Sequence, residues 1–306
     1  MKMVTNKNGG IGMKVELNCH TNISDGSSSF EELLEVAKRE SIGHLAITNH
    51  DTTMRLQEMV ERGKEIGIEI IPGIEVSGYD FARGRRVHIL GYFVEPGHKA
   101  LEELCNPLIH KRNAACEKMV ERLIHAGYRI TWDQVSKFRG GTGVYKQHIM
   151  LALRESGYTD SIYGDLYKKI FSRGQNGEEP GIAFIPMEYV DAILAVKAIR
   201  AAGGVPVLAH PGQYGSFEII PDLVEAGLEG IEVLHPHHGY AEEERAISYA
   251  DQYNLIKTGG SDFHGDYGEN PIRLGSMSPG KECVDALKLR KKSMSINDVV
   301  LKNIDL

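Results

Sequence analysis

Imidazole and carboxylate side chains recur along this sequence where apolar segments that predict β-strands come to an end. The segment 15–26, "VELNCHTNISDG", runs from an apolar start into His20 and Asp25. Later segments end in the same way, with His50, Glu75, His88, His210, Asp262 and His264. The carboxyl ends of neighbouring parallel strands share one face of a sheet, so these groups are expected to converge there. Mixed His and carboxylate ligands suit Mn, Fe or Zn ions.

One histidine at the end of one strand would be unremarkable, because buried polar side chains are usually hydrogen-bonded structural residues. Five such histidines, accompanied by Glu75 and Asp262, indicate a metal centre instead. The other eight histidines are interpreted mostly as surface or packing residues; they are His44, His98, His110, His125, His148, His235, His237 and His238.

Strand and helix patterns alternate in two parts of the chain. In the first part, strands such as "IEIIPGIEVS" alternate with the helices predicted in "SFEELLEVAKRE" and "TTMRLQEMVERGKEIG". The alternation returns after residue 186. It predicts an α/β fold with a parallel sheet, closed as a barrel or open and doubly wound. The barrel is preferred, because the sequence contains neither GxGxxG after a strand nor GxxxxGK[ST].

Residues 14–97 and 186–292 are therefore predicted to form one discontinuous barrel domain. The mostly helical segment 98–185 interrupts this domain as an insertion domain. Residues 1–13 lack the apolar core of a signal peptide and are expected to be a flexible leader. Residues 293–306 are assigned to a C-terminal tail.

The composition of the 306-residue chain argues against several classes of protein. A formal net charge of −7 does not favour a duplex nucleic acid as partner, and no apolar run reaches the length of a membrane span. The four cysteines are scattered without a CxxC pair, which favours free thiols and a cytoplasmic location. An anionic substrate would need a local positive centre, which bound metal ions can supply.

Six motifs occur in order between residues 16 and 265: "ELNCHTNISDG", "AITNHD", "GIEVS", "VHILGY", "VLAHPG" and "GGSDFHG". Together they resemble the motifs of the PHP (polymerase and histidinol phosphatase) metallophosphoesterases. The helical segment between them resembles the insertion found in the branch that hydrolyses nucleotide phosphates. Each motif alone is weak, whereas six in register are specific.

The resemblance implies a distorted seven-stranded β/α barrel with a trinuclear metal centre, and we expect two or three divalent metal ions. Carried onto matching positions, the implied ligands form three sets: Asn18, His20, Glu75 and Asp262 around the first ion, Glu75, His88 and His210 around the second, and Asp25, His50 and His264 around the third. In the implied mechanism a hydroxide that bridges two cations attacks phosphorus. Glu75, Asp262 and His238 are the predicted catalytic residues, with His238 as the candidate acid for the leaving oxygen.

Asn18 stands where most of the resembling proteins carry histidine. A carboxamide oxygen can bind a metal ion, but it is neutral and a weaker ligand than imidazole. We expect an altered first site that is still occupied; a two-metal enzyme and an inactive relative are the alternatives. Asn49 likewise replaces a common Asp, and alternation directs it away from His50, so its effect should be indirect.

The predicted substrate-binding residues are Lys146, His148, Gln213 and His238. The resembling nucleotide phosphatases commonly carry Arg at the positions of Lys146 and Gln213, and neither side chain offers the two-pronged guanidinium. This difference predicts a preference for substrates with one phosphate. Arg83, Arg85 and Arg86 could compensate, although a solvated loop is the preferred interpretation for them.

The sequence therefore predicts a metal-dependent phosphoesterase that acts on a small phosphate monoester, such as a nucleotide or the 5′ end of a short oligonucleotide. Two other activities stay open: a histidinol-phosphate-like phosphatase, and an amidohydrolase-type enzyme that hydrolyses a carbon centre. A non-catalytic binding protein is a further alternative. No duplex nucleic acid or membrane partner is expected, and the oligomeric state is not predicted.

Overall fold

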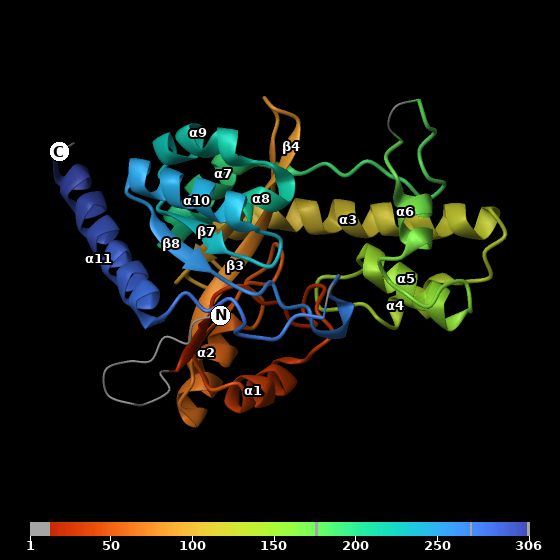
Figure 1. Ribbon diagram of the computed structural model, residues 1–306, viewed down its shortest axis with the longest axis horizontal. Helices are drawn as coiled ribbons and strands as arrows, with labels where there is room; N and C mark the ends of the chain where they lie inside the picture. Colours follow the sequence, from red (N-terminus) through yellow and green to blue (C-terminus); the bar gives the residue numbers. More distant parts are fainter. Residues whose placement is uncertain (1–12, 175–176, 270, 305–306) are drawn as a thin grey trace.

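A mixed β-sheet forms the centre of the molecule (Figure 1). The computed structural model describes residues 13–174, 177–269 and 271–304, so the expected leader lies outside the described residues except for Met13. Seven strands follow one path in the order β1-β2-β3-β4-β6-β7-β8, and β5 pairs with β3 beside it. The strands are β1 (Lys14–Glu16), β2 (Ile42–Ile47), β3 (Glu69–Asp80), β4 (Arg85–Tyr92), β5 (Val190–Asp191), β6 (Val205–Leu208), β7 (Gly230–Leu234) and β8 (Ile256–Gly259).

Strand β4 is the exception to the expected parallel arrangement. It runs antiparallel to both β3 and β6, whereas the β1–β2, β2–β3, β6–β7 and β7–β8 pairs are parallel. Only residues 81–84 separate β3 from β4, and a connection that short can form a hairpin but not a parallel crossover. His88 consequently lies within β4 rather than after it. It pairs with Ser77, two residues beyond Glu75, so His88 and Glu75 project from the same face.

The sheet curves until the segments that follow its first and last strands meet. Cys19, after β1, forms a parallel bridge with Phe263, after β8. The backbone N–H of His20 donates to the carbonyl of Phe263 at 2.9 Å, and the N–H of Phe263 donates to the carbonyl of Asn18 at 3.3 Å. The predicted α/β class is confirmed. Within the described residues β1 and β8 are joined at this bridge and not along their length.

Helices cover the outside of the curved sheet, with α1 and α2 on one side and α7 to α10 on the other (Figure 1). Ser29 and Glu32 cap α1 reciprocally, and Gly67 ends α2 with a φ of 76°. The covering helices are α1 (Phe30–Arg39), α2 (Leu56–Ile66), α7 (Ala192–Ala201), α8 (Pro211–Tyr214), α9 (Ile220–Glu225), α10 (Tyr240–Tyr253) and α11 (Lys281–Ile304), with short 3₁₀ turns η1 (Phe217–Ile219) and η2 (Gly265–Tyr267). Helix α11 runs across residue 293, where the tail was expected to begin.

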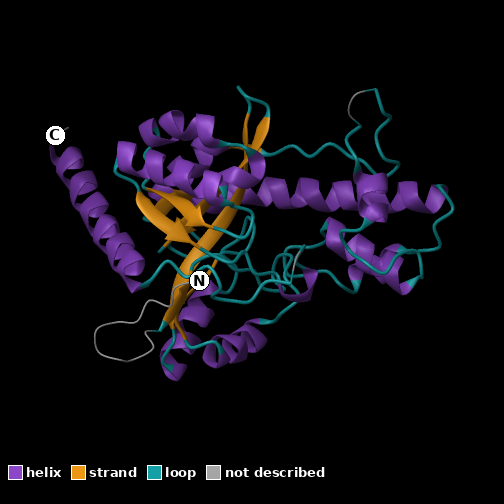
Figure 2. Ribbon diagram, viewed as in Figure 1, coloured by secondary structure: helices purple, strands orange, loops and turns teal. Residues whose placement is uncertain are grey.

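The segment between β4 and β5 forms a separate helical body at one end of the molecule (Figure 2). It contains α3 (Lys99–His125), α4 (Trp132–Ser136), α5 (Lys146–Glu155) and α6 (Asp165–Phe171). Leu123 and Leu153 belong to its own apolar cluster, whereas Leu101 and Cys105, at the start of α3, pack into the cluster of the sheet. The long helix α3 therefore joins the two bodies. Within the described residues, no helix combines the length and the apolarity needed to cross a membrane.

We propose that this helical body is the insertion domain, and the chain's single tryptophan tests the division. Trp132 packs against the cluster that contains Leu153, which is fully buried. Leu153→Ala should lower the urea midpoint of the Trp132 fluorescence transition, because truncating a buried leucine costs about 2 to 5 kcal/mol. Leu223→Ala, the matched truncation in the sheet cluster, should shift the far-UV circular dichroism transition more than the fluorescence transition. Identical shifts in both signals for both variants would contradict a separate domain.

Candidate metal centre

Imidazole and carboxylate groups gather at the mouth of the curved sheet. They form four groups in which the possible ligand atoms lie within 4.8 Å of one another: His20, Asp25, His50 and His264; His50, Glu75 and His88; His210, His235 and Asp262; and His20, Glu75 and Asp262. Eight of the nine predicted ligands are therefore brought together, and His235 joins them. These side chains come from β3 and β4 and from the segments that follow β1, β2, β6, β7 and β8.

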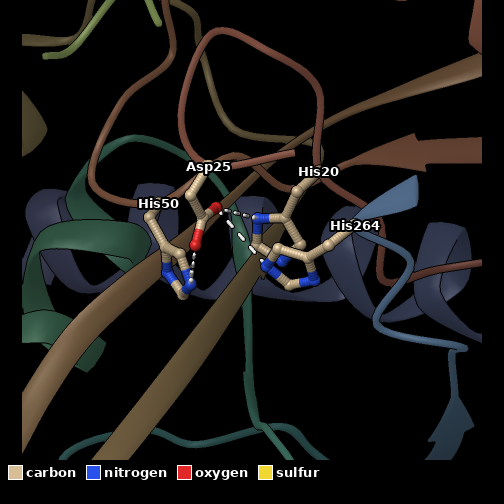
Figure 3. Close-up of side chains that lie close together, drawn as sticks. All are labelled: His20, Asp25, His50 and His264. Carbon is tan, nitrogen blue, oxygen red and sulfur yellow. Dashed lines mark ion pairs between the residues drawn. The ribbon is translucent and has the colours of Figure 1, made fainter. Parts of the chain in front are cut away.

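The carboxylate of Asp25 lies among three imidazoles (Figure 3). Its Oδ1 is 3.4 Å from His264 Nε2 and 3.7 Å from His20 Nδ1, and its Oδ2 is 3.8 Å from His50 Nε2. His264 donates from Nδ1 to the carbonyl of Asp262 at 2.8 Å, so Nε2 is the nitrogen that faces Asp25. A histidine fixed through one nitrogen in this way presents the other as a metal ligand.

Glu75 faces imidazoles through both of its oxygens. Oε1 lies 2.7 Å from His88 Nδ1 and 2.9 Å from His210 Nε2. Oε2 lies 3.0 Å from His20 Nε2 and 3.8 Å from His50 Nδ1. The side chain is buried, and Glu75 belongs to two of the four groups of possible ligands.

Several buried atoms of the centre have no hydrogen-bond partner: both ring nitrogens of His20, Oε2 of Glu75 and Oδ1 of Asp262. His20 Nε2 lies only 3.0 Å from Glu75 Oε2 and 3.2 Å from Asp262 Oδ1. His20, Glu75 and Asp262 form one of the four groups described above, so these atoms lie within reach of a single ion. Leaving them unpaired would carry a large desolvation penalty, so the residues fit bound divalent cations.

The charges of the centre favour cations. Burial opposes ionisation of Asp25, but His264 and His50 hold the pKa of its carboxyl well below the ordinary value. Burial likewise opposes ionisation of Glu75, and His50 and His88 hold its pKa well below the usual range. Burial lowers the pKa of His50 to about 4, so its imidazole is neutral. Ionised carboxylates and neutral imidazoles are the forms that bind metal ions.

Asn18 is fully buried, and both ends of its carboxamide are hydrogen-bonded. Nδ2 donates to Glu232 Oε1 at 3.4 Å, and Oδ1 accepts from the Thr48 hydroxyl at 3.1 Å. Glu232 Oε2 also accepts from the backbone N–H of His210 at 2.8 Å, and burial raises the pKa of Glu232 to about 8. Asn18 thus belongs to a polar network that extends to His210, and its role as a ligand stays a prediction.

Asn49 has the indirect position expected for it. Its Oδ1 accepts from the backbone N–H of Thr21 at 2.8 Å and from the hydroxyl of Ser24 at 3.0 Å. The Ser24 hydroxyl is in turn 3.1 Å from Asp25 Oδ1. Asn49 therefore orders the turn that carries Asp25 without facing the centre itself.

His235 is the member of the centre that the sequence analysis missed. Its side chain is buried, and Nε2 lies 3.6 Å from Asp262 Oδ2. Nδ1 accepts the backbone N–H of His237 at 3.1 Å, and burial lowers the pKa of the ring to about 4. The neutral ring therefore carries its proton on Nε2. His235 follows β7, so the strand-end pattern that identified the other histidines also applies to it.

The predicted substrate-binding residues separate in space. Gln213 lines a cavity of about 400 Å³ above the centre, and Lys146 lines an adjoining cavity of about 870 Å³. His148 and His238 line neither. His148 Nδ1 accepts the backbone N–H of Tyr145 at 3.2 Å at the start of α5. His238 donates from Nδ1 to the carbonyl of Val233 at 2.8 Å and accepts the N–H of Gly212 at Nε2, so neither nitrogen is free for the predicted acid role.

Two insertion residues that the sequence analysis did not select also contact the centre. Gln147, on α5, donates to Asp25 Oδ2 at 2.9 Å. Arg112, on α3, pairs with Asp51, the neighbour of His50, and its guanidinium carbon lies 4.7 Å from the ring centre of Tyr145. Arg112 lines both cavities. Polar residues within long helices give no periodic signal of such contacts, so only their placement identifies them.

Comparison with known proteins places this arrangement among phosphoesterases. A sequence model of the family described as PHP domain matches residues 16–214. The chain is 44% identical over 257 residues to the phosphoribosyl 1,2-cyclic phosphate 1,2-diphosphodiesterase of Eggerthella lenta, covering 84% of this chain and 96% of that one. It is 28% identical to a 5′-3′ exoribonuclease of Haemophilus influenzae, covering 82% and 90%. A crystal structure from Bifidobacterium adolescentis, assigned as a metal-dependent phosphoesterase, superposes with a TM-score of 0.80 at 27% identity, covering 91% and 96%.

Glu75→Gln should remove metal from the purified protein, because an amide cannot replace a carboxylate that faces imidazoles through both oxygens. Elemental analysis should show at least one divalent ion per chain fewer than in the wild type. Glu69→Gln is the control, since Glu69 begins the same strand and pairs with His44 and Lys288 on the surface. A full metal complement in Glu75→Gln would contradict a role for Glu75 as a metal ligand.

Asn18→His restores the imidazole that the resembling proteins carry. We expect it to slow the loss of the first metal ion to a chelator by on the order of tenfold, with equal or higher activity, because imidazole is the stronger ligand. Asn22→His is the control, since it adds an imidazole at an exposed position of the same loop. Faster metal loss and lower activity in Asn18→His would mean that the network with Thr48 and Glu232 requires the carboxamide.

Proposed function

This chain belongs to the PHP domain family of metal-dependent phosphoesterases, and we propose that its substrate is a small phosphate monoester, either a nucleotide or the 5′ end of a short oligonucleotide. The observation that carries the proposal is the convergence of buried, unpaired ligand atoms beneath a cavity whose wall includes Arg86 and Arg112. The carboxylates of the centre suit bound cations, and the guanidinium groups of the cavity wall suit a phosphate.

We propose that the centre holds two or three divalent ions, with Mn, Fe and Zn as the candidates. The ligands in this proposal are His20, Asp25, His50, Glu75, His88, His210, Asp262 and His264, with Asn18 as a weaker oxygen ligand. Ions bound there would supply Lewis acidity and would lower the pKa of a water molecule to about 7. The charges described above keep the carboxylates ionised and His50 neutral. Although burial opposes it, Glu75 raises the pKa of His210 to about 9, so cations that bind there would displace a proton from this imidazole.

The remaining residues of the cavity wall would position the substrate. Arg112 is held by Asp51 and Tyr145, so its guanidinium enters the cavity in a fixed orientation. His235 accepts a hydrogen bond at Nδ1, whereas a metal-bound histidine normally donates from its second nitrogen. We therefore assign His235 the role of an Nε2–H donor toward a phosphoryl or leaving oxygen, in place of the acid role predicted for His238. Gln213 supplies a further neutral donor to the same cavity.

The names of the two relatives reported above favour a ribose phosphate over the alternatives. The Eggerthella lenta relative is named for a phosphoribosyl substrate and the Haemophilus influenzae relative for ribonucleic acid, whereas neither name refers to histidinol phosphate or an amide. The four cysteines are buried and unpaired, which supports a reducing compartment, and we include a cytoplasmic location in the proposal.

Phosphate release by the metal-loaded protein tests the proposal. The substrates to compare are ribonucleoside monophosphates, a 5′-phosphorylated dinucleotide, histidinol phosphate and an N-acyl amide. We expect turnover with the ribose phosphates. Chelation should lower that turnover by about 10³-fold or more, and added Mn²⁺ should restore it, because the cations provide both the nucleophile and the charge neutralisation. Hydrolysis of the amide without hydrolysis of any phosphate ester would support the amidohydrolase alternative, and turnover insensitive to chelation would refute a metal-dependent reaction.

A further inference from the structure

The helical insertion contacts the segment that carries Asp25 through hydrogen bonds from both backbone and side chains. The backbone N–H and the hydroxyl of Thr142 both donate to the carbonyl of Ile23, at 2.9 and 3.0 Å. Gln147 donates to Asp25 Oδ2 at 2.9 Å. The side chains of Thr142 and Gln147 are buried. We call residues 140–147 of the insertion the contact segment.

The contact segment approaches the Asp25 segment too closely to carry a side chain at Gly140. A Cβ there would lie 2.2 Å from the carbonyl oxygen of Asn22, so any side chain would push the two segments apart. Asn113, on α3, donates from Nδ2 to the carbonyl of Thr142 at 2.9 Å. The contact segment is therefore fixed between the long helix of the insertion and the segment that carries Asp25.

The insertion also holds the segment of His50. The guanidinium of Arg112 pairs with the carboxylate of Asp51, which follows His50 directly in the sequence. Both side chains are largely buried, so removing either partner would leave an uncompensated charge in the interior. Arg112 also donates to the hydroxyl of Tyr145 at 3.1 Å, and the Tyr145 ring centre lies 6.5 Å from that of His50.

The segment of His264 contacts the insertion through an aromatic residue. Tyr267, in η2, packs against the apolar cluster of the insertion, and its ring centre lies 5.9 Å from that of His148 on α5. His264 lies three residues before Tyr267, and its carbonyl accepts the N–H of Ser27 at 2.9 Å. Ser27 follows Asp25 by two residues, so the segments of these two predicted ligands are joined to each other as well.

The ligands predicted for the second ion differ, because they are held by the sheet. Their side chains form hydrogen bonds and ion pairs with one another and with neighbouring histidines of the centre; these ligands are Glu75, His88 and His210. Among the described residues, none of these side-chain bonds extends to the insertion. The insertion does reach β3 at Ser77, whose hydroxyl lies 3.4 Å from Arg112.

We propose that the helical insertion positions the ligands of the third ion, so that the affinity of this site for a divalent cation depends on the contact segment. Asp25, His50 and His264 are three of the four side chains drawn in Figure 3. Gln147 is then a positioning residue, because a neutral N–H donor orients the Asp25 carboxylate without removing its charge. By reciprocity, an ion bound at the third site strengthens the packing of the insertion on the sheet. This inference rests on the proposed function, in which the centre binds divalent ions.

Metal release tests the inference. Wild type and Gln147→Leu are loaded with Mn²⁺ and desalted, the ions per chain are counted by elemental analysis, and their loss to a chelator is followed. Gln147→Leu should lose one ion about 10- to 100-fold faster, the range typical of removing a hydrogen-bond partner from a metal ligand. The remaining ions should leave at the wild-type rate.

Leu153→Ala is the control for general destabilisation of the insertion. It truncates a buried side chain of the same helix, which belongs to the apolar cluster and forms no contact with Asp25. At a temperature where circular dichroism shows both variants folded, Leu153→Ala should release its ions at the wild-type rate. Equal acceleration in Gln147→Leu and Leu153→Ala would reduce the role of Gln147 to structural support and would overturn the inference.

Ligand variants assign the effect to one of the ions. His264→Ala lacks a ligand predicted for the third ion alone, so adding Gln147→Leu should change the metal content and the release no further. His88→Ala lacks a ligand of the second ion, and there Gln147→Leu should still accelerate the loss of one ion. The same additional change in both backgrounds, including none in either, would overturn the inference.

The reciprocal effect is measured through Trp132, which packs against the apolar cluster of the insertion. Saturating Mn²⁺ should raise the urea midpoint of the Trp132 fluorescence transition in the wild type, because a ligand that binds only the folded form stabilises it. The rise should be smaller in His264→Ala and in Gln147→Leu. A rise of the same size in all three proteins would contradict coupling between the third ion and the insertion.

The outcomes distinguish the two proposals. If the wild type binds no divalent ion, the proposed function fails and the inference fails with it. If the wild type binds ions, and Gln147→Leu holds and releases them as the wild type does, the inference alone is refuted and the metal-dependent function stands.

Discussion

The rest of the structure depends on the cost of burying ionised carboxylates and unpaired imidazoles at one point. Asp25, Glu75 and Asp262 enter a space where ring nitrogens lie about as close to their oxygens as hydrogen-bond partners, yet several of the atoms form no hydrogen bond. Such a group is costly in a protein interior unless positive charges neutralise it, and bound cations would do so. The polar network below, in which Glu232 holds both Asn18 and the backbone of His210, fixes the ligands that the cations would draw together.

The curved sheet meets this constraint by bringing distant segments to one mouth. The antiparallel hairpin of β3 and β4 places Glu75 and His88 on one face, and the bridge between Cys19 and Phe263 brings the segments that carry His20 and Asp262 together. Two residues of the helical insertion also contact residues at this mouth. Gln147 reaches Asp25, and Arg112 reaches Asp51. The helical body is thus bound to the centre by hydrogen bonds and charge, and it forms much of the wall of the second cavity.

The positions of individual residues explain where sequence reasoning succeeded and where it could not. The strand-end pattern identified eight of the clustered ligands, because strand alternation and the shared carboxyl edge of a sheet are local and repeating rules. His235 obeys the same pattern and was overlooked among four neighbouring positions that hold three histidines. His148 and His238 were selected for their side chains, but backbone groups occupy both ring nitrogens of His238 and Nδ1 of His148. No sequence pattern reports which nitrogen of a histidine accepts a bond from a distant N–H.

The sequence by itself determined the α/β class, the family, and most of the residues that surround the metal centre, because these follow from hydrophobic periodicity and from motifs of a few adjacent residues. Only the tertiary structure decided which histidines join the centre, how Asn18 is held, and which arginine of "ARGRRVH" faces the substrate cavity. The reason is that each of these outcomes depends on a partner far away in the chain. Arg85 meets Glu218 and Arg83 meets Asp222, whereas Arg86 meets tyrosine faces and no acid of the described residues. Whether an arginine is paired with an acid or left facing a cavity therefore depends on the groups that folding places beside it.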